Sequence, residues 1–188
     1  MLVIGTFFLQ AAVAGVFLTS GLSKVRGEAN LRTWTDLADR LPVRRFPATA
    51  ASRAHIAVEL LIGAALLAGT WARIPGLLAA ALLFAAFTLL ALYSARAEKA
   101  VACSCFGTAR SALGWPHVWR NVTLFVLAVT GLIGAVTTGP ALPPSLGAAA
   151  VAAVAAVAVT AVTFYFDDLV DLFRSGSGSA QSAPLSRR

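Results

Sequence analysis

Five largely apolar stretches, each close to 20 residues long, constrain this chain more than any other feature. They run over about residues 2–22, 54–72, 74–94, 120–138 and 146–166. An α-helix needs about 20 apolar residues to cross the ~30 Å hydrocarbon layer of a bilayer, whereas a buried helix of a soluble protein more often stops at 10–14. Each stretch therefore predicts a membrane-spanning helix, and we expect an all-α, integral membrane helical bundle.

The composition supports this expectation. Hydrophobic residues make up 59% of the chain and charged residues 12%, against about 25% charged residues in an average globular protein. The net charge of +7 could suggest nucleic acid, but the basic residues lie between the apolar stretches and form no stripe interleaved with aromatics. They are expected to set topology and to contact lipid head groups, and no nucleic-acid partner is predicted.

The polar segments define the expected organisation. No Lys or Arg precedes the first stretch, so a retained helix is expected and a cleaved signal peptide is not. Apolar residues recur at helical spacing near 28–41, which predicts an amphipathic helix in the membrane interface, with a plain loop as the alternative. Residues 1–138 are expected to form a core, 139–170 to add one transmembrane helix, and the Ser/Gly-rich 171–188 to be a disordered tail.

The distribution of basic residues predicts an orientation in the cell membrane. If the five helices alternate in direction, fourteen of the fifteen Lys and Arg residues fall on the side that holds the cysteines, and only Arg73 falls on the other. The positive-inside rule then places the cysteine loop in the cytoplasm and the N-terminus outside.

The same alternation brings most polar side chains of the chain to one side. They are Lys24, His55, Glu59, His117, Arg120 and Asn121. We expect them to line the mouth of the bundle, where they would bind a quinone head group or relay protons. His55 and Glu59 are one helical turn apart and share a face.

Glu59 and His55 each have two interpretations. A carboxylate inside the hydrocarbon is costly unless it is paired or protonated. Glu59 is therefore either a proton carrier or head-group anchor, or the acidic partner of a structural ion pair with Lys24, Arg26 or Arg120. His55 is closer to the interface and is either solvated and lightly paired or catalytic.

The only two cysteines form the sharpest signal. Cys103 and Cys105 are separated by one serine, so a disulfide between them would close a small, strained ring. Strain makes such a bond labile, which suits thiol–disulfide exchange better than structural cross-linking. Lys99, Arg110 and His117 would stabilise a nucleophilic thiolate. We predict Cys103 and Cys105 as the catalytic pair.

Two other interpretations of the cysteines compete. Together with His117 they supply three soft ligands that could hold zinc or copper, but structural zinc takes four, and no metal site is predicted. Inert, buried cysteines are the second alternative, which their position in a polar loop disfavours. Cys-x-Cys is a weaker signature than Cys-x-x-Cys, so the spacing by itself does not decide.

Several segments also resemble a known group of membrane proteins. Residues 20–24 (SGLSK), 58–63 (VELLIG) and 66–69 (LLAG) resemble DoxX-like proteins, and 103–107 (CSCFG) with 117–121 (HVWRN) is similar to their methylamine-utilisation branch, MauE. The resemblance spans roughly residues 5–138. It implies a four-helix DoxX-like core, to which the fifth transmembrane helix is an addition.

The resemblance also implies a role in disulfide formation or thiol redox of partner proteins, often beside a thioredoxin-like protein. Disulfide-bond protein B and vitamin K epoxide reductase use comparable small bundles to pass electrons to a quinone, and a quinone is therefore the candidate cofactor. That comparison is an analogy of architecture. This chain lacks their second cysteine pair, so its relay would be shorter or would borrow cysteines from a partner.

The expected function is therefore a membrane thiol–disulfide redox protein that exchanges electrons with a thioredoxin-like or substrate protein through the Cys-x-Cys loop. The expected orientation conflicts with disulfide formation, which belongs outside the cytoplasm. Either a cytoplasmic thioredoxin-like donor meets the loop, or the charge rule fails for this chain. The alternative function is a non-catalytic subunit or assembly factor of a larger membrane complex. A small transporter is disfavoured, because the polar residues stop at one side.

Overall fold

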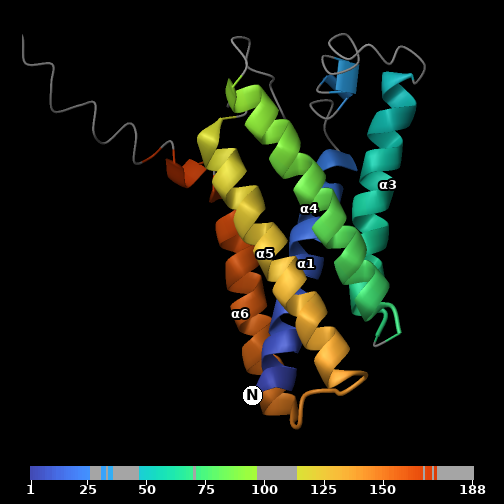
Figure 1. Ribbon diagram of the computed structural model, residues 1–188, viewed down its shortest axis with the longest axis vertical. Helices are drawn as coiled ribbons and strands as arrows, with labels where there is room; N and C mark the ends of the chain where they lie inside the picture. Colours follow the sequence, from blue (N-terminus) through green and yellow to red (C-terminus); the bar gives the residue numbers. More distant parts are fainter. Residues whose placement is uncertain are drawn as a thin grey trace, which may run out of the picture.

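The computed structural model contains five long helices. It describes residues 1–25, 31–32, 34–35, 47–69, 71–96, 114–166, 168–170 and 172. The helices are α1 (Leu2–Val25), α3 (Ala48–Leu67), α4 (Arg73–Arg96), α5 (Trp115–Thr138) and α6 (Leu146–Phe164) (Figure 1). Each is long and apolar enough to cross a membrane. The predicted class, an integral membrane helical bundle, is confirmed.

Two helices begin earlier than the apolar stretches predict. α3 begins at Ala48, because helical hydrogen bonding continues through a polar turn that hydropathy does not mark. α5 begins at Trp115 and has Pro116 in its first turn, where the missing N–H of proline removes no helical hydrogen bond. Hydropathy therefore locates the span, and local backbone chemistry sets the helix end.

Three predictions fall mainly outside the described residues. Within the segment expected to form the interfacial helix, only residues 31–32 and 34–35 are described, and they are helical. The expected disordered tail is described only at Leu172, and both cysteines lie in the segment 97–113 that the structure does not describe.

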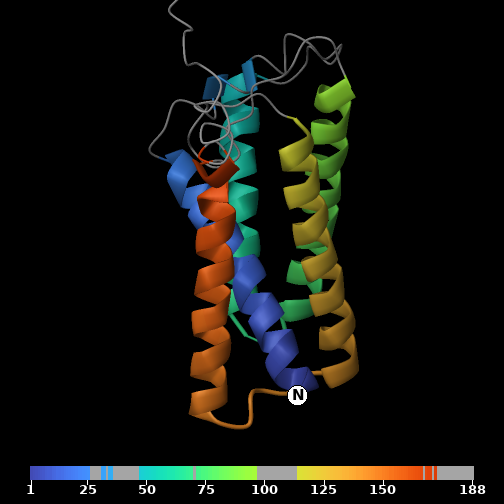
Figure 2. The same cartoon turned by 90° about the vertical axis from the view of Figure 1, so that its left-hand side faces the viewer.

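Helix α1 is central to the bundle, because it contacts α3, α4, α5 and α6. It crosses the bundle obliquely, with α6 beside it (Figure 2). The core along α1 includes Val13, Val16 and Phe17, and the Phe17 ring stacks on Phe84 of α4 at 4.8 Å between centroids. Large apolar side chains such as Leu82 and Ile133 point outward, as expected for a surface that faces lipid.

Glycines let the helices approach α1 closely. A Cβ atom on Gly63 of α3 would lie 2.6 Å from Cγ of Leu18, and one on Gly15 would overlap the Thr160 hydroxyl of α6. Small residues at such contacts are the usual means of bringing backbones together in a membrane, where apolar burial by itself gives little driving force. The added helix α6 is thus seated on α1 through a glycine.

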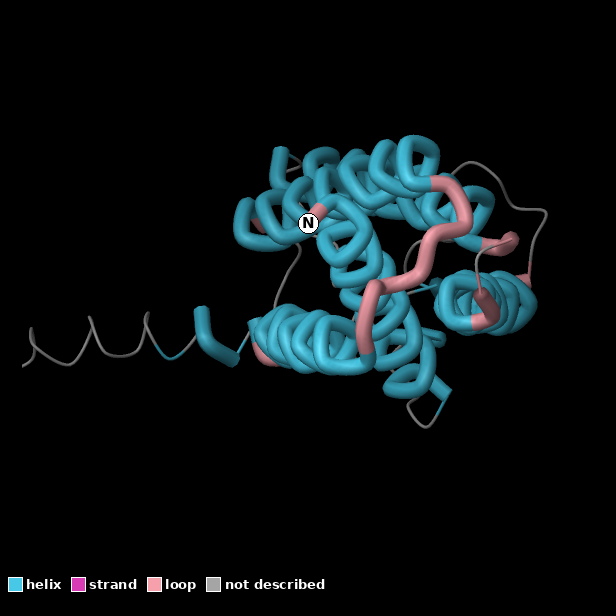
Figure 3. The backbone as a smooth tube through the Cα atoms, turned by 90° about the horizontal axis from the view of Figure 1, so that it is seen from below, coloured by secondary structure: helices cyan, strands magenta, loops and turns pink. Residues whose placement is uncertain are grey.

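The only basic residue predicted on the N-terminal side has a structural role there. Arg73 is buried at the start of α4 and donates from Nη1 to the carbonyl oxygen of Gly139 at 3.1 Å, and from Nη2 to that of Ala141 at 3.5 Å. These carbonyls belong to the connection from α5 to α6, which crosses this end of the bundle (Figure 3). Arg73 therefore joins the two helical connections at this end.

Candidate functional site

The opposite end of the bundle brings the predicted site residues together. Here α1 and α4 end and α3 and α5 begin (Figure 1). The chain segment that holds Cys103 and Cys105 joins α4 to α5, so its two anchoring helix ends both lie here, although the cysteines are outside the described residues. The other six predicted residues are all described, and they occupy two separate places.

The first place is a buried ion pair between α1 and α3. Nζ of Lys24 lies 2.6 Å from Oε1 and 2.7 Å from Oε2 of Glu59, and the two residues are 3% and 2% exposed. Ser20 joins the pair, because its hydroxyl donates to Oε1 at 3.0 Å and accepts from Nζ at 2.8 Å. Of the cations that the sequence offers to Glu59, the structure pairs Lys24 with it, and Arg26 lies outside the described residues. Dense hydrogen bonding is what makes such a buried pair tolerable.

His55 is the third titratable member of this cluster. Its Nε2 lies 3.0 Å from Oε1 of Glu59 and 3.2 Å from Nζ of Lys24. A bare Nε2 can accept from the ammonium, and a protonated Nε2 can donate to the carboxylate, but one nitrogen cannot do both. The geometry therefore admits two proton arrangements that differ at a single atom. We call Ser20, Lys24, His55 and Glu59 the α1/α3 cluster.

Aromatic rings hold the imidazole of His55 in place. The ring of Phe87 on α4 stacks against it at 5.2 Å and 27°, and Trp34 meets it edge-on at 5.6 Å. Rings on two sides restrict the orientation of the imidazole, so Nε2 stays directed at the ion pair. His55 is also less buried than the pair itself, with 10% of its side chain exposed.

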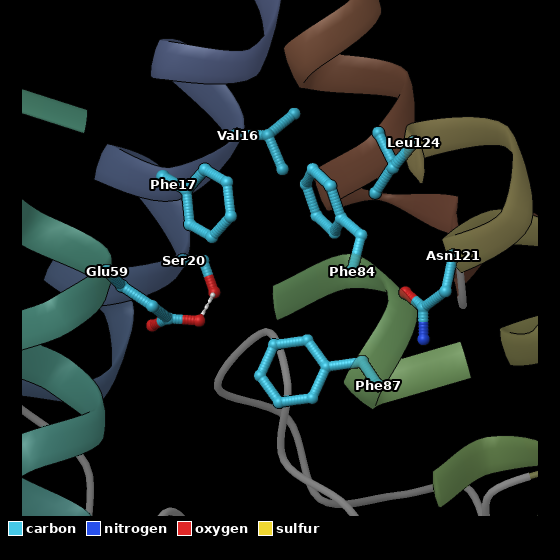
Figure 4. A pocket seen from close by; sticks show the side chains of 8 residues that line it. All are labelled: Val16, Phe17, Ser20, Glu59, Phe84, Phe87, Asn121 and Leu124. Atoms are coloured by element: carbon cyan, nitrogen blue, oxygen red, sulfur yellow. Dashed lines mark hydrogen bonds between the residues drawn. The ribbon is translucent and has the colours of Figure 1, made fainter. Parts of the chain in front are cut away.

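A small cavity lies beside Glu59 and Ser20 (Figure 4). Its volume is about 10 Å³, close to the minimum for one water molecule. Asn121 of α5 lines its far side, and Nδ2 of this buried amide has no hydrogen-bond partner among the described atoms. The space suits a water between the amide and the cluster. A quinone head group is far larger than this cavity.

The second place lies on an adjacent face of α5, since Leu124 lines both it and the cavity. Arg120 points toward α6, with its guanidinium carbon 5.9 Å from the centre of the Phe166 ring. It lines a groove of about 410 Å³ between α5 and α6, which we call the α5/α6 groove. His117 is buried in the first turn of α5. The mouth predicted as one site is therefore divided, with Asn121 facing the cavity and Arg120 facing the groove.

Sequence reasoning missed several residues of these two places. Ser20 is one turn before Lys24, and that spacing on one face was the available signal. No sequence signal marked Phe87 or Phe166, because aromatic residues in apolar stretches are ordinary core or lipid-facing residues. Their roles follow only from the way in which the helices are rotated against one another.

Comparison with known families gives one match. The family described as methylamine utilisation protein MauE matches residues 2–134. No curated protein and no solved structure matches the chain. The matched residues include α1, α3, α4 and nearly all of α5, whereas α6 lies beyond them. This multi-pass membrane protein therefore belongs to the MauE family.

Proposed function

We propose that the protein is a membrane thiol–disulfide redox protein that exchanges electrons with a thioredoxin-like or disulfide-containing partner protein. The observation that carries the proposal is the α1/α3 cluster, in which His55 Nε2 is within hydrogen-bond distance of both Lys24 and Glu59. The cluster lies at the end of the bundle where the segment with both cysteines joins α4 and α5.

The proposed exchange moves two electrons and two protons. The Cys103 thiolate attacks a disulfide of the partner, which forms a mixed disulfide and releases one partner thiolate. The Cys105 thiolate then attacks the Cys103 sulfur, which closes the Cys103–Cys105 disulfide and releases the second partner thiolate. The reverse sequence oxidises the partner. The protons lost by the two cysteines are taken up by the two partner thiolates.

The cluster supports this chemistry through proton transfer. A thiol reacts only as its thiolate, so a group that accepts and returns a proton near the reacting cysteine speeds exchange. His55 is suited to this role, because a proton arriving at Nε2 is stabilised by the Glu59 carboxylate and its loss by the Lys24 ammonium. In the reverse direction, in which the protein oxidises its partner, the Cys103–Cys105 pair is left as a dithiol. A quinone is the proposed acceptor that reoxidises it, since a dithiol and a quinone give a disulfide and a quinol with no atom left over.

Single cysteine variants test the proposal. We expect Cys103→Ser to lose all exchange with oxidised thioredoxin, and Cys105→Ser to trap a mixed disulfide, because the resolving thiol is missing. Purified protein in lipid nanodiscs, followed by alkylation gel shift and non-reducing electrophoresis, gives both readouts. Ser104→Ala is the matched control and should exchange normally. If both cysteine variants exchange at the full rate, the thiol function is wrong.

The proposed orientation places the cysteine end in the cytoplasm and the N-terminus outside. It rests on the excess of Lys and Arg at that end. We expect a membrane-impermeant maleimide to leave Cys103 and Cys105 unlabelled in intact cells, with or without prior reduction, and to label them after permeabilisation. Trp71→Cys in a cysteine-free background is the control, because residue 71 is 94% exposed at the opposite end. Labelling of the native pair from outside would reverse the orientation.

A second candidate function is a non-catalytic subunit of a larger membrane complex. The exposed valines of α6, which include Val151, Val154 and Val157, favour it, because they lie on a helix beyond the family match. A partner subunit could cover this face. Stoichiometric co-purification of such a subunit, together with full function of both cysteine variants, would select this role over thiol chemistry.

A further inference from the structure

The α5/α6 groove combines a charge near the membrane interface with an apolar slot beneath it. Trp119, which lines the end of the groove that contains Arg120, is 66% exposed, and Tyr165, next in the chain to the lining residue Phe166, is 55% exposed. Exposed Trp and Tyr mark the level of the lipid head groups on membrane helices. Arg120 follows Trp119 directly, so its guanidinium lies near that level.

Below Arg120 the groove is almost entirely apolar. On the α5 side it continues through Leu124 to Leu127, and on the α6 side through Val162 to Ala158. Seven residues of helix from Arg120 to Leu127 correspond to about 10 Å of depth at 1.5 Å per residue. The slot therefore extends from head-group level into the hydrocarbon layer, which is the direction of an acyl chain.

The two threonine hydroxyls in the groove already have hydrogen-bond acceptors, so neither hydrogen needs one from a ligand. Thr123 donates to the carbonyl oxygen of Trp119 at 3.0 Å, and Thr163 donates to that of Val159 at 2.8 Å. Both hydrogens are thus used within their own helices. Among the described lining residues the charged one is Arg120, which is 5% exposed. The planar donors of a guanidinium match phosphate oxygens better than the neutral carbonyls of a quinone ring.

We propose that the α5/α6 groove binds one anionic phospholipid, with its phosphate at Arg120 and one acyl chain between α5 and α6. The site does not depend on thiol chemistry. Its α6 wall lies outside the residues matched by the MauE family, so the site belongs to the five-helix chain. The bound lipid would lie against Leu124, which also lines the cavity beside Glu59.

Native mass spectrometry of the purified protein, with phosphatidylglycerol added at low molar excess, tests the site. We expect one phosphatidylglycerol to be retained, and phosphatidylcholine to be retained about tenfold less or weaker, because it lacks a net negative charge. Ala158→Phe should fill the slot and abolish retention, and Arg120→Gln should lower it about tenfold. Ala153→Phe is the matched control, because Ala153 is an exposed alanine of α6 that does not line the groove.

Quenching of Trp119 fluorescence provides a second readout for folded variants. Phosphatidylglycerol brominated along its chains should quench Trp119 at a low mole fraction and leave Trp71, at the opposite end, unquenched. The Trp119→Phe variant shows how much of the quenched fluorescence comes from Trp119. Equal lipid retention by Ala158→Phe and Ala153→Phe would overturn the proposal, as would equal retention of the two lipids. Displacement of the lipid by a ubiquinone analogue, or a dimer mass in place of bound lipid, would assign the groove to those occupants and overturn it equally.

Discussion

Replacement of Glu59 by alanine is expected to destabilise the protein by about 3–5 kcal/mol, the usual cost of leaving one partner of a buried ion pair unpaired. Among the described residues, Lys24 would keep Ser20 and His55 as partners in a setting where it is 3% exposed. The measurement is the midpoint of thermal unfolding in detergent, followed by size-exclusion chromatography. Lys24→Met should also destabilise, because it leaves the carboxylate buried.

The double variant Lys24→Met/Glu59→Leu distinguishes the two interpretations of the cluster. Removing both charges together commonly restores stability, because neither charge is then left unpaired. A stable double variant that exchanges thiols at the normal rate would show that the pair only joins α1 to α3. A stable double variant with slow exchange would show that the cluster also handles protons. His55→Phe is the complementary test, because it keeps an aromatic ring beside Phe87 and removes both ring nitrogens, including the Nε2 that faces the ion pair.

Replacement of Gly15 by leucine is expected to displace α6 from α1 and to cost about 1–3 kcal/mol or more. The added side chain would meet Thr160, whose hydroxyl donates to the carbonyl oxygen of Ala156 at 2.9 Å and holds its rotamer. The neighbour therefore cannot turn aside without losing that hydrogen bond. The thermal midpoint should fall and phosphatidylglycerol retention should be lost, because α6 is one wall of the α5/α6 groove.

Gly5→Leu is the matched control for this prediction. It makes the same substitution on the same helix, but nothing lies within 4 Å of the position of its Cβ. An unchanged midpoint for Gly15→Leu, equal to that of Gly5→Leu, would contradict the close contact between α1 and α6. A lower thermal midpoint with full lipid retention would support the close contact between α1 and α6 and would contradict the prediction that displacing α6 removes the lipid.

The sequence could predict the spans, because a bilayer imposes a strong local rule. With no water in the hydrocarbon layer, each apolar stretch must satisfy its own backbone as a helix, whatever its neighbours are. The positions of Lys24, Glu59 and Asn121 near one end follow from the same rule, since successive helices alternate in direction. Motif resemblance supplied the MauE family, which the match over residues 2–134 confirms.

The tertiary structure decided what those side chains contact. Lys24, Arg26 and Arg120 were equal candidates for Glu59 in the sequence, because pairing depends on the rotation of each helix about its axis. Glycines let the helices approach α1 closely, and in the packed bundle Lys24 lies against Glu59 while Arg120 faces Phe166. The sequence of each span was therefore enough to predict which end of the bundle a side chain lies at. The division of that end into the buried α1/α3 cluster and the α5/α6 groove required the packed helices.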